Sequence, residues 1–115
     1  MSQDKAEEPL RGEVWLVAFD PSVGGEVRKT RPGIVVSNDA ANRVLNRVQV
    51  VPVTSRLATL YPAEAYVTVN GARRKAMADQ LTTASKQRLH RKIGKVGSGD
   101  LAALETAIKI QLDLM

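Results

Sequence analysis

The chain has 115 residues, 43% of them hydrophobic, and a formal net charge of +5 at pH 7. This length suits one compact domain with a modest core and leaves no room for a second domain. The lack of cysteine excludes disulfides and thiolate metal sites, and no apolar run is long enough to span a bilayer. We therefore expect a cytoplasmic protein with no membrane segment, in which a disordered N-terminal tail (residues 1–10) precedes one domain (residues 11–115).

The positive charge is concentrated in the middle of the chain. Residues 28–95 contain 14 basic and 3 acidic residues, a net charge of +11, so the two ends together carry −6. Such a segment favours a polyanionic partner, nucleic acid first, because neutralised phosphates release counterions on binding. A basic surface that serves only solubility explains the charge equally well at this stage. Aromatic residues are scarce, so any base recognition is expected to depend on hydrogen bonds more than on stacking.

The segment around which the chain is organised is a polar loop that runs into a β-branched strand, residues 20–38. Pro32 biases Arg31 towards an extended backbone, and residues 34–36 form the continuous apolar run that is typical of a buried strand. Arg31 is therefore expected where the core meets solvent. Gly24 and Gly25, earlier in the same segment, let the loop bend over a ligand. The alternative interpretation is a solvated connection between two strands.

The remaining elements can be predicted in chain order. Strands are expected at residues 12–19, 33–37, 47–54, 63–69, from about 73 through 84, and at 90–96, with short helical turns near residues 37–43 and 85–88. Trp15 and Phe19 are expected to belong to the core. Pro52 removes a hydrogen-bond donor, which predicts that its strand lies at a sheet edge or ends there. Asn70-Gly71 predicts a hairpin turn.

A helix is expected at residues 98–114. Ser98 is a plausible N-cap, Asp100 suits the positive end of the helix dipole, and Glu105 with Lys109 forms an i,i+4 pair. Apolar residues cover roughly half of the helix circumference or more, which is wider than one small sheet requires. The surplus indicates a second copy of the chain as partner.

The sequence shows no histidine-rich spacing and no paired carboxylates near the basic segment, so a metal enzyme is not expected. The single histidine, His90, stands among basic residues and is expected at the surface. RNA carries its own nucleophile in the 2′-hydroxyl group, so an enzyme acting on it must mainly align that oxygen and stabilise the charge of the phosphorane. Arg31 presents a fixed fork of donors for phosphate oxygens, and Thr54 supplies a further donor. On these residues alone, RNA cleavage is one of several possible functions.

Several segments taken together carry a family resemblance. They are RGEVWLVAFDPSVGGEVRKTRPGIVVSN, VVPVTS, LYPAEAYV, AMADQLTT and RKIGKV, followed by the C-terminal helix. In this order, from residue 11 to about 114, the chain resembles the MazF/PemK family of toxin ribonucleases from bacterial toxin-antitoxin pairs. Each motif alone is weak, and their joint occurrence is specific. The loop at Val27–Thr30 departs from the small and glycine residues that many members have.

The resemblance implies a mainly β fold with a C-terminal helix (α+β), namely a small SH3-like β-barrel. It further implies a homodimer without cofactor that cleaves single-stranded RNA independently of metal, leaving 2′,3′-cyclic phosphate and 5′-hydroxyl ends. An acidic antitoxin of the MazE/PemI type would inhibit it. The catalytic positions of the family fall on Arg31, Thr54 and Glu26, and the RNA-binding positions on Phe19, Arg28, Lys29, Thr30, Ser55, Arg56, Tyr61, Asp79 and Gln80.

Arginine stays protonated in proteins, which assigns Arg31 to the stabilisation of phosphate and leaving group. Glu26 or a bound water is then the more plausible acceptor of the 2′-hydroxyl proton. Two alternatives use the same fold. One is a CcdB-like toxin that acts on DNA gyrase without chemistry, against which the presence of Arg31 and Thr54 argues. The other is a nucleic-acid-binding barrel without activity.

Overall fold

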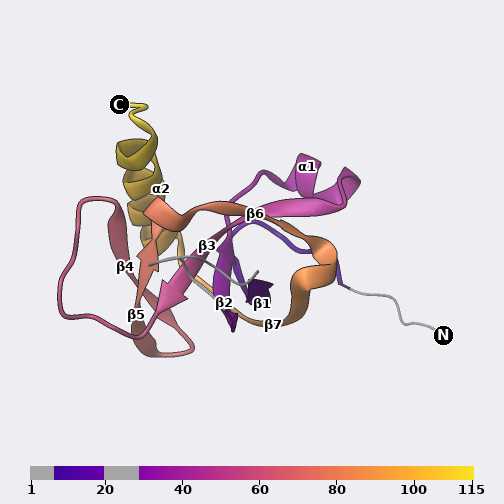
Figure 1. The fold of residues 1–115 in the computed structure, drawn as a ribbon, viewed down its shortest axis with the longest axis horizontal. Coiled ribbons are helices and arrows are strands. Elements are labelled where there is room, and N and C mark those ends of the chain that lie inside the picture. The colour runs from indigo at the N-terminus through magenta and orange to yellow at the C-terminus, as the bar shows by residue number, and fades with distance from the viewer. Residues whose placement is uncertain (1–6, 20–28) are drawn as a thin grey trace.

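A computed structural model describes residues 7–19 and 29–115, which form an antiparallel sheet with a C-terminal helix at one end (Figure 1). The strand order is β4-β5-β3-β2-β1-β7, and β6 also pairs with β3. This confirms the predicted mainly β fold with a C-terminal helix. The elements are β1 (Glu13–Phe19), β2 (Lys29–Val35), α1 (Asp39–Val44), β3 (Arg47–Thr54), β4 (Glu64–Val69), β5 (Ala72–Met77), the 3₁₀ turn η1 (Ala78–Gln80), β6 (Thr82–Ser85), the 3₁₀ turn η2 (Lys86–Arg88), β7 (Leu89–Lys95) and α2 (Ser98–Leu112).

Local signals in the sequence account for several boundaries. Asn70 and Gly71 have φ values of +50° and +80°, as a type I′ turn requires, and they join β4 to β5 as predicted. The side chain of Asn38 caps α1 by accepting a hydrogen bond from the amide of Ala41. The β3 strand has its predicted bounds.

The prediction that Pro52 marks a sheet edge is wrong, because β3 is central. It pairs with β2 on one side, and on the other side with β6 along residues 47–50 and with β5 along residues 53–54. Pro52 is buried and falls where β3 passes from one partner to the next. A residue without an amide hydrogen is tolerated in this interval because the described strands offer no ladder partner there on that side.

The single strand predicted from residue 73 through 84 is divided into β5 and β6. The chain turns at η1 because β5 pairs with the end of β3 and β6 pairs with its beginning. Asp79 and Gln80 therefore lie in a turn between two strands and not within the one strand that was predicted.

Side chains alternate between the two faces of the sheet and pack into one apolar cluster on each face. The helix-side cluster lies between the sheet and α2, which contributes Leu104 and Ala107. The second cluster lies on the other face and contains the predicted core residue Trp15, which is 5% exposed, with Phe19 packed against it. Its buried members are Trp15, Val17, Val35, Val48, Val50 and Ala84.

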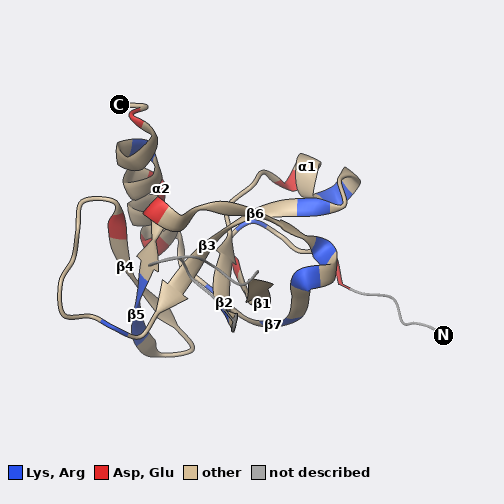
Figure 2. Cartoon of the chain, in the orientation of Figure 1, with Lys and Arg blue, Asp and Glu red and all other residues tan. Residues whose placement is uncertain are grey.

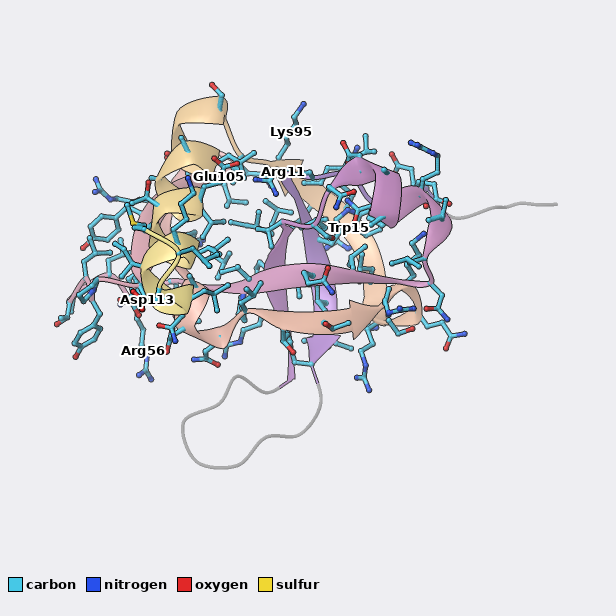
Figure 3. All side chains as sticks on the ribbon, turned by 90° about the horizontal axis from the view of Figure 1, so that it is seen from above. Arg11, Trp15, Arg56, Lys95, Glu105 and Asp113 are labelled. Carbon is cyan, nitrogen blue, oxygen red and sulfur yellow. The ribbon has the colours of Figure 1, made fainter. Side chains whose placement is uncertain are left out.

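Two details of α2 differ from the prediction. Gly97 is the N-cap, and no side chain caps this end, so Ser98 is the first helical residue. Glu105 binds Arg11, which also donates a hydrogen bond to the Val36 carbonyl and so ties the start of the domain to the helix (Figure 3). Asp100 lies in the first turn as predicted.

The segment before β1 makes ion pairs with the edge of the sheet. Glu7 lies 3.2 Å from the ammonium group of Lys92, and Glu8 lies 2.9 Å from that of Lys86. Of the predicted tail, residues 1–6 lie outside the described residues. In the part of the chain that the structure describes, no helix is long and apolar enough to cross a membrane.

Candidate functional site

Arg31 lies in β2 opposite Val17 of β1 and is half-buried. Residues 31, 33 and 35 point to the face of the second cluster, because side chains alternate along a strand. Gly33 leaves room there, since a Cβ at Gly33 would meet Val17 Cγ2 at 3.2 Å and Phe19 Cζ at 3.5 Å. Arg31 therefore lies on the same face of the sheet as the second cluster, at the edge of its apolar side chains.

The Nε atom of Arg31 is buried and has no hydrogen-bond partner, and it is the only buried side-chain nitrogen or oxygen in this condition among residues 7–19 and 29–115. Leaving a buried donor unsatisfied costs roughly 1–3 kcal/mol. A guanidinium group held in this way is ready to bind an oxyanion, because its donors are fixed in a planar fork.

The register of two neighbouring strands relates Thr54 to Arg31. The β2–β3 ladder pairs Val35 with Val50 and ends at Gly33 and Pro52, and the same register continued by two residues would bring Arg31 opposite Thr54. The Thr54 hydroxyl oxygen accepts a hydrogen bond of 3.2 Å from the Arg56 amide. Because its oxygen is used as the acceptor, the hydroxyl proton is directed elsewhere and can serve a ligand.

Residues 55–63, the β3–β4 loop, are held by side chains of the sheet. The Tyr66 hydroxyl donates to the carbonyl of Leu57 at 2.9 Å, and the Lys75 ammonium donates to that of Thr59 at 2.5 Å. Glu64 accepts from the amide of Tyr61 at 3.0 Å. The loop thus has a fixed backbone, while its predicted RNA-binding side chains Ser55, Arg56 and Tyr61 are exposed.

Two of the predicted RNA-binding residues meet at a pocket of about 320 Å³. Tyr61, which is 61% exposed, and Asp79 of η1 line this pocket together with Ile110 and Gln111 of α2. Gln80 turns towards Met77, whose sulfur accepts from its amide nitrogen at 3.9 Å. The predicted site residues therefore fall into two groups, one at the end of the second cluster and one between the β3–β4 loop and α2.

The first group is only partly described. Thr30 is exposed beside Arg31, and Phe19 packs its ring against the second cluster. Glu26 and Arg28 lie outside the described residues, and of Lys29 only the backbone is described, where it pairs with Phe19. The proton acceptor proposed from the sequence is therefore not placed.

Several residues at the site were missed by the sequence analysis. Lys75 and Glu64 form a buried ion pair beneath the β3–β4 loop, with 3.1 Å between nitrogen and oxygen. The guanidinium of Arg88 in η2 donates to the carbonyl of Ala18 at 3.1 Å, close to where Val17 pairs with Leu89. No local signal marks these residues, because Lys75 occurs in a run of three basic residues and its burial depends on the loop that covers it.

Basic side chains occur at both ends of the sheet, on β5 at one end and around β7 at the other (Figure 2). His90 is exposed on β7, as predicted. Within the described ranges, no three acidic or histidine side chains come together in a group that could hold a metal ion. The pKa of Lys92 is raised by hydrogen bonds from its ammonium group to Glu13 and Glu7.

Fold and site together define a small basic antiparallel-sheet protein that presents an arginine with a buried, unpartnered donor and a threonine on adjacent strands. The family model described as "PemK-like, MazF-like toxin of type II toxin-antitoxin system" matches residues 10–112. The chain belongs to this family of toxins.

Among curated proteins, the chain is similar to Endoribonuclease MazF9 of Mycobacterium tuberculosis, with 42% identity over 113 residues that cover 90% of this chain and 96% of the relative. Among solved structures, MazF from Deinococcus radiodurans matches with a TM-score of 0.81 at 26% identity, covering 94% of this chain and 99% of the other. A mycobacterial endoribonuclease solved in complex with its cognate antitoxin matches with a TM-score of 0.78 at 26% identity, covering 93% and 97%.

Proposed function

We propose that this chain is the endoribonuclease toxin of a type II toxin-antitoxin pair and acts on single-stranded RNA in the cytoplasm. Family membership supports the toxin role, and the name of the 42% identical mycobacterial relative supports the activity. The observation that carries the proposal is the unpartnered buried Nε of Arg31 on a strand whose register aligns Arg31 with Thr54.

In the proposed reaction, the 2′-hydroxyl oxygen of RNA attacks the adjacent phosphorus. The P–O bond to the next ribose breaks, which leaves a 2′,3′-cyclic phosphate and a 5′-hydroxyl group. Arg31 stabilises the negative charge that develops on the phosphorane oxygens, and the Thr54 hydroxyl donates a further hydrogen bond. No metal is required, because these donors supply the charge stabilisation.

The proton of the attacking 2′-hydroxyl group needs an acceptor. Arg31 is unsuited to this role because a guanidinium stays protonated at neutral pH. Glu26, in the segment between β1 and β2, or a water molecule is the proposed acceptor, and the leaving 5′-oxygen takes up a proton from water.

In this proposal, the residues around Arg31 and Thr54 determine which RNA sequence is preferred. Arg28, Lys29 and Thr30 directly precede Arg31 in the chain, Phe19 pairs with Lys29 across the sheet, and Ser55 and Arg56 follow Thr54 directly. Tyr61 and Asp79 at the pocket beside α2, with Gln80, form the second part of the proposed RNA path.

The proposed assembly is a homodimer that an acidic antitoxin inhibits. Ile110, Leu112, Leu114 and Met115 at the end of the chain are between 44% and 77% exposed, and burial against a second copy would remove them from water. A flexible acidic polypeptide of the MazE/PemI type suits the basic surface and would block Arg31 by charge and by volume.

The test is an RNA cleavage assay in EDTA with a mixed-sequence single-stranded substrate. The proposal predicts defined cuts that disappear when the cognate antitoxin is added. Binding without cutting would instead indicate a nucleic-acid-binding barrel, and inhibition of DNA gyrase without RNA cleavage would indicate a CcdB-like toxin. An antitoxin complex that still cuts RNA would refute occlusion as the means of inhibition.

A further inference from the structure

Lys75 is buried in β5, although lysine is almost never buried without a partner. Its side chain is 8% exposed, and its ammonium group contacts Glu64 Oε1 at 3.1 Å and the Thr59 carbonyl at 2.5 Å. Both partners lie outside β5, since Glu64 begins β4 and Thr59 belongs to the β3–β4 loop. The buried charge therefore fastens a loop to the sheet.

The position of Lys75 in the sheet connects this loop with the proposed reaction centre. Lys75 pairs with Thr54 of β3 on one side and with Tyr66 of β4 on the other. Paired residues of neighbouring strands share a face, so these three side chains form a row. Each of them binds the backbone of the same loop, at Arg56, Leu57 and Thr59.

A contribution to the stability of the fold does not explain why a buried ion pair occurs at this position. Replacing a buried ion pair by well-packed apolar side chains is often neutral or stabilising, because desolvation offsets the Coulomb attraction. What apolar side chains lack is the hydrogen bonds that fix the Thr59 carbonyl and the Tyr61 amide. These bonds hold the loop that displays Arg56 and Tyr61 while its side chains remain exposed.

We propose that Lys75, assisted by Tyr66, is a positioning residue that holds the β3–β4 loop in the conformation in which Arg56 and Tyr61 meet RNA beside Thr54. This inference rests on the proposed endoribonuclease function. Loss of the Lys75 contact lets the loop move relative to Thr54. A misplacement of about 1 Å can cost about 10²-fold in rate, and discrimination between RNA sequences weakens with it.

The experiment compares Glu64→Gln with the double variant Lys75→Met/Glu64→Gln. Lys75→Met alone would leave the Glu64 carboxylate buried without its cation, which destabilises the fold for an unrelated reason. The side-chain amide introduced by Glu64→Gln retains an oxygen that accepts from the Tyr61 amide, so this substitution keeps the hydrogen bonds and removes only the charge. The two variants then differ only at residue 75, whose ammonium group binds the Thr59 carbonyl and the side chain of residue 64 in the single variant and is absent from the double variant.

Three quantities are measured for both variants: kcat/KM on a preferred RNA and on the same RNA with altered flanking bases, the melting temperature, and amide hydrogen exchange at residues 57–61. Glu64→Gln leaves the Lys75 ammonium group without its counter-charge, so we expect a lower melting temperature, but a kcat/KM close to the parental value because the bond to the Thr59 carbonyl remains. The double variant should remain folded, cut about 10²-fold more slowly, discriminate less, and exchange its loop amides faster. A folded double variant with parental cleavage and discrimination would overturn the proposal, as would an equal loss in both variants.

If the double variant does not fold, Tyr66→Phe tests the proposal instead. It removes only the hydroxyl that binds the Leu57 carbonyl. The proposal predicts slower cleavage at an unchanged melting temperature, and parental cleavage and loop exchange would contradict it. A parental protein that cuts no RNA would refute the proposed function instead, and the loop exchange would still decide whether Lys75 orders the loop.

Discussion

The β2–β3 register ends at the pair Gly33 and Pro52, and continued by two residues it relates Arg31 of β2 to Thr54 of β3. In the proposed mechanism, this register brings a guanidinium and a hydroxyl group to the same phosphate. The scaffold behind Arg31 is the second cluster, whose apolar side chains hold β1, β2 and β3 in place.

Substitution of the aligned pair should abolish most of the activity. Removing one preorganised donor to a developing anion costs about 10²-fold or more in kcat, so we expect this loss for Arg31→Ala and a measurable loss for Thr54→Val. Arg31→Lys should also be poor because a point charge lacks the planar fork. Rates are compared with Arg47→Ala, an exposed residue at the other end of β3. Parental rates in all three site variants would place the centre elsewhere.

Binding should weaken steeply with salt and be unaffected by EDTA. Each phosphate contact to a single strand contributes about −0.7 to the slope of log K against log salt. Arg56→Gln should therefore make the slope shallower by about this amount if Arg56 contacts a phosphate, whereas Arg43→Gln on the exposed face of α1 should not. Activity that EDTA removes and magnesium restores would contradict the metal-independent mechanism.

Substitution of Gly33 should destabilise the fold because of its close neighbours. The Cβ of Gly33→Ala would lie 3.2 Å from Val17 Cγ2 and 3.5 Å from Phe19 Cζ, so the second cluster must shift at a cost of about 1 kcal/mol or more. Gly99→Ala is the matched control in α2, where a Cβ meets nothing within 4 Å. There we expect a gain of about 0.4–1 kcal/mol. In denaturant unfolding, the change in unfolding free energy should have opposite signs for the two variants. An unchanged unfolding free energy for Gly33→Ala would show that the second cluster adapts to the added methyl group.

Asp39 should contribute to the fall of stability in acid. Hydrogen bonds from the Arg11 amide and then from the Asn42 side chain lower the pKa of Asp39 below its ordinary value of 3.8. A carboxyl whose folded pKa is depressed stabilises the fold above its unfolded pKa and loses this contribution as pH falls through the folded pKa. The difference in unfolding free energy between parent and Asp39→Asn should thus shrink below pH 3.8. Parallel curves through this range would refute the assignment.

The end of α2 should mediate self-association. Leu112 is 50% exposed in the single chain, and Leu112→Glu would place a charge in the proposed interface. Sedimentation should show a dimer for the parent and for Thr106→Glu on an exposed part of the same helix, and a monomer for Leu112→Glu. A monomeric parent at micromolar concentration would contradict the dimer.

The sequence predicted those features of the fold that depend on local chemistry. Asn70-Gly71 specifies its turn by backbone conformation, and the helical turn predicted near residues 37–43 forms as α1, capped by Asn38. The errors concern long-range pairing. Pro52 was assigned to an edge because the sequence does not reveal that β3 exchanges one partner for another at this residue. Glu105 was paired within its helix because its partner, Arg11, is 94 residues away.

For the candidate site, the sequence singles out Arg31 and Thr54 because their motifs lie near strand ends, and their roles stay predictions. The site was not predictable where function depends on burial. Lys75 looks like one of three adjacent surface cations until the β3–β4 loop covers it. The family resemblance names exposed loop residues, and only the structure reveals the side chains that hold their backbone.

The most direct test of the mechanism is cleavage of an RNA in which the nucleotide on the 5′ side of the cut carries a single 2′-deoxy substitution. If the 2′-hydroxyl group is the nucleophile and Arg31 stabilises the phosphorane, the all-ribose RNA is cut in EDTA to 2′,3′-cyclic phosphate and 5′-hydroxyl ends. The substituted RNA then binds but remains intact. Cutting of the 2′-deoxy substrate, or products with a 5′-phosphate, would contradict this account.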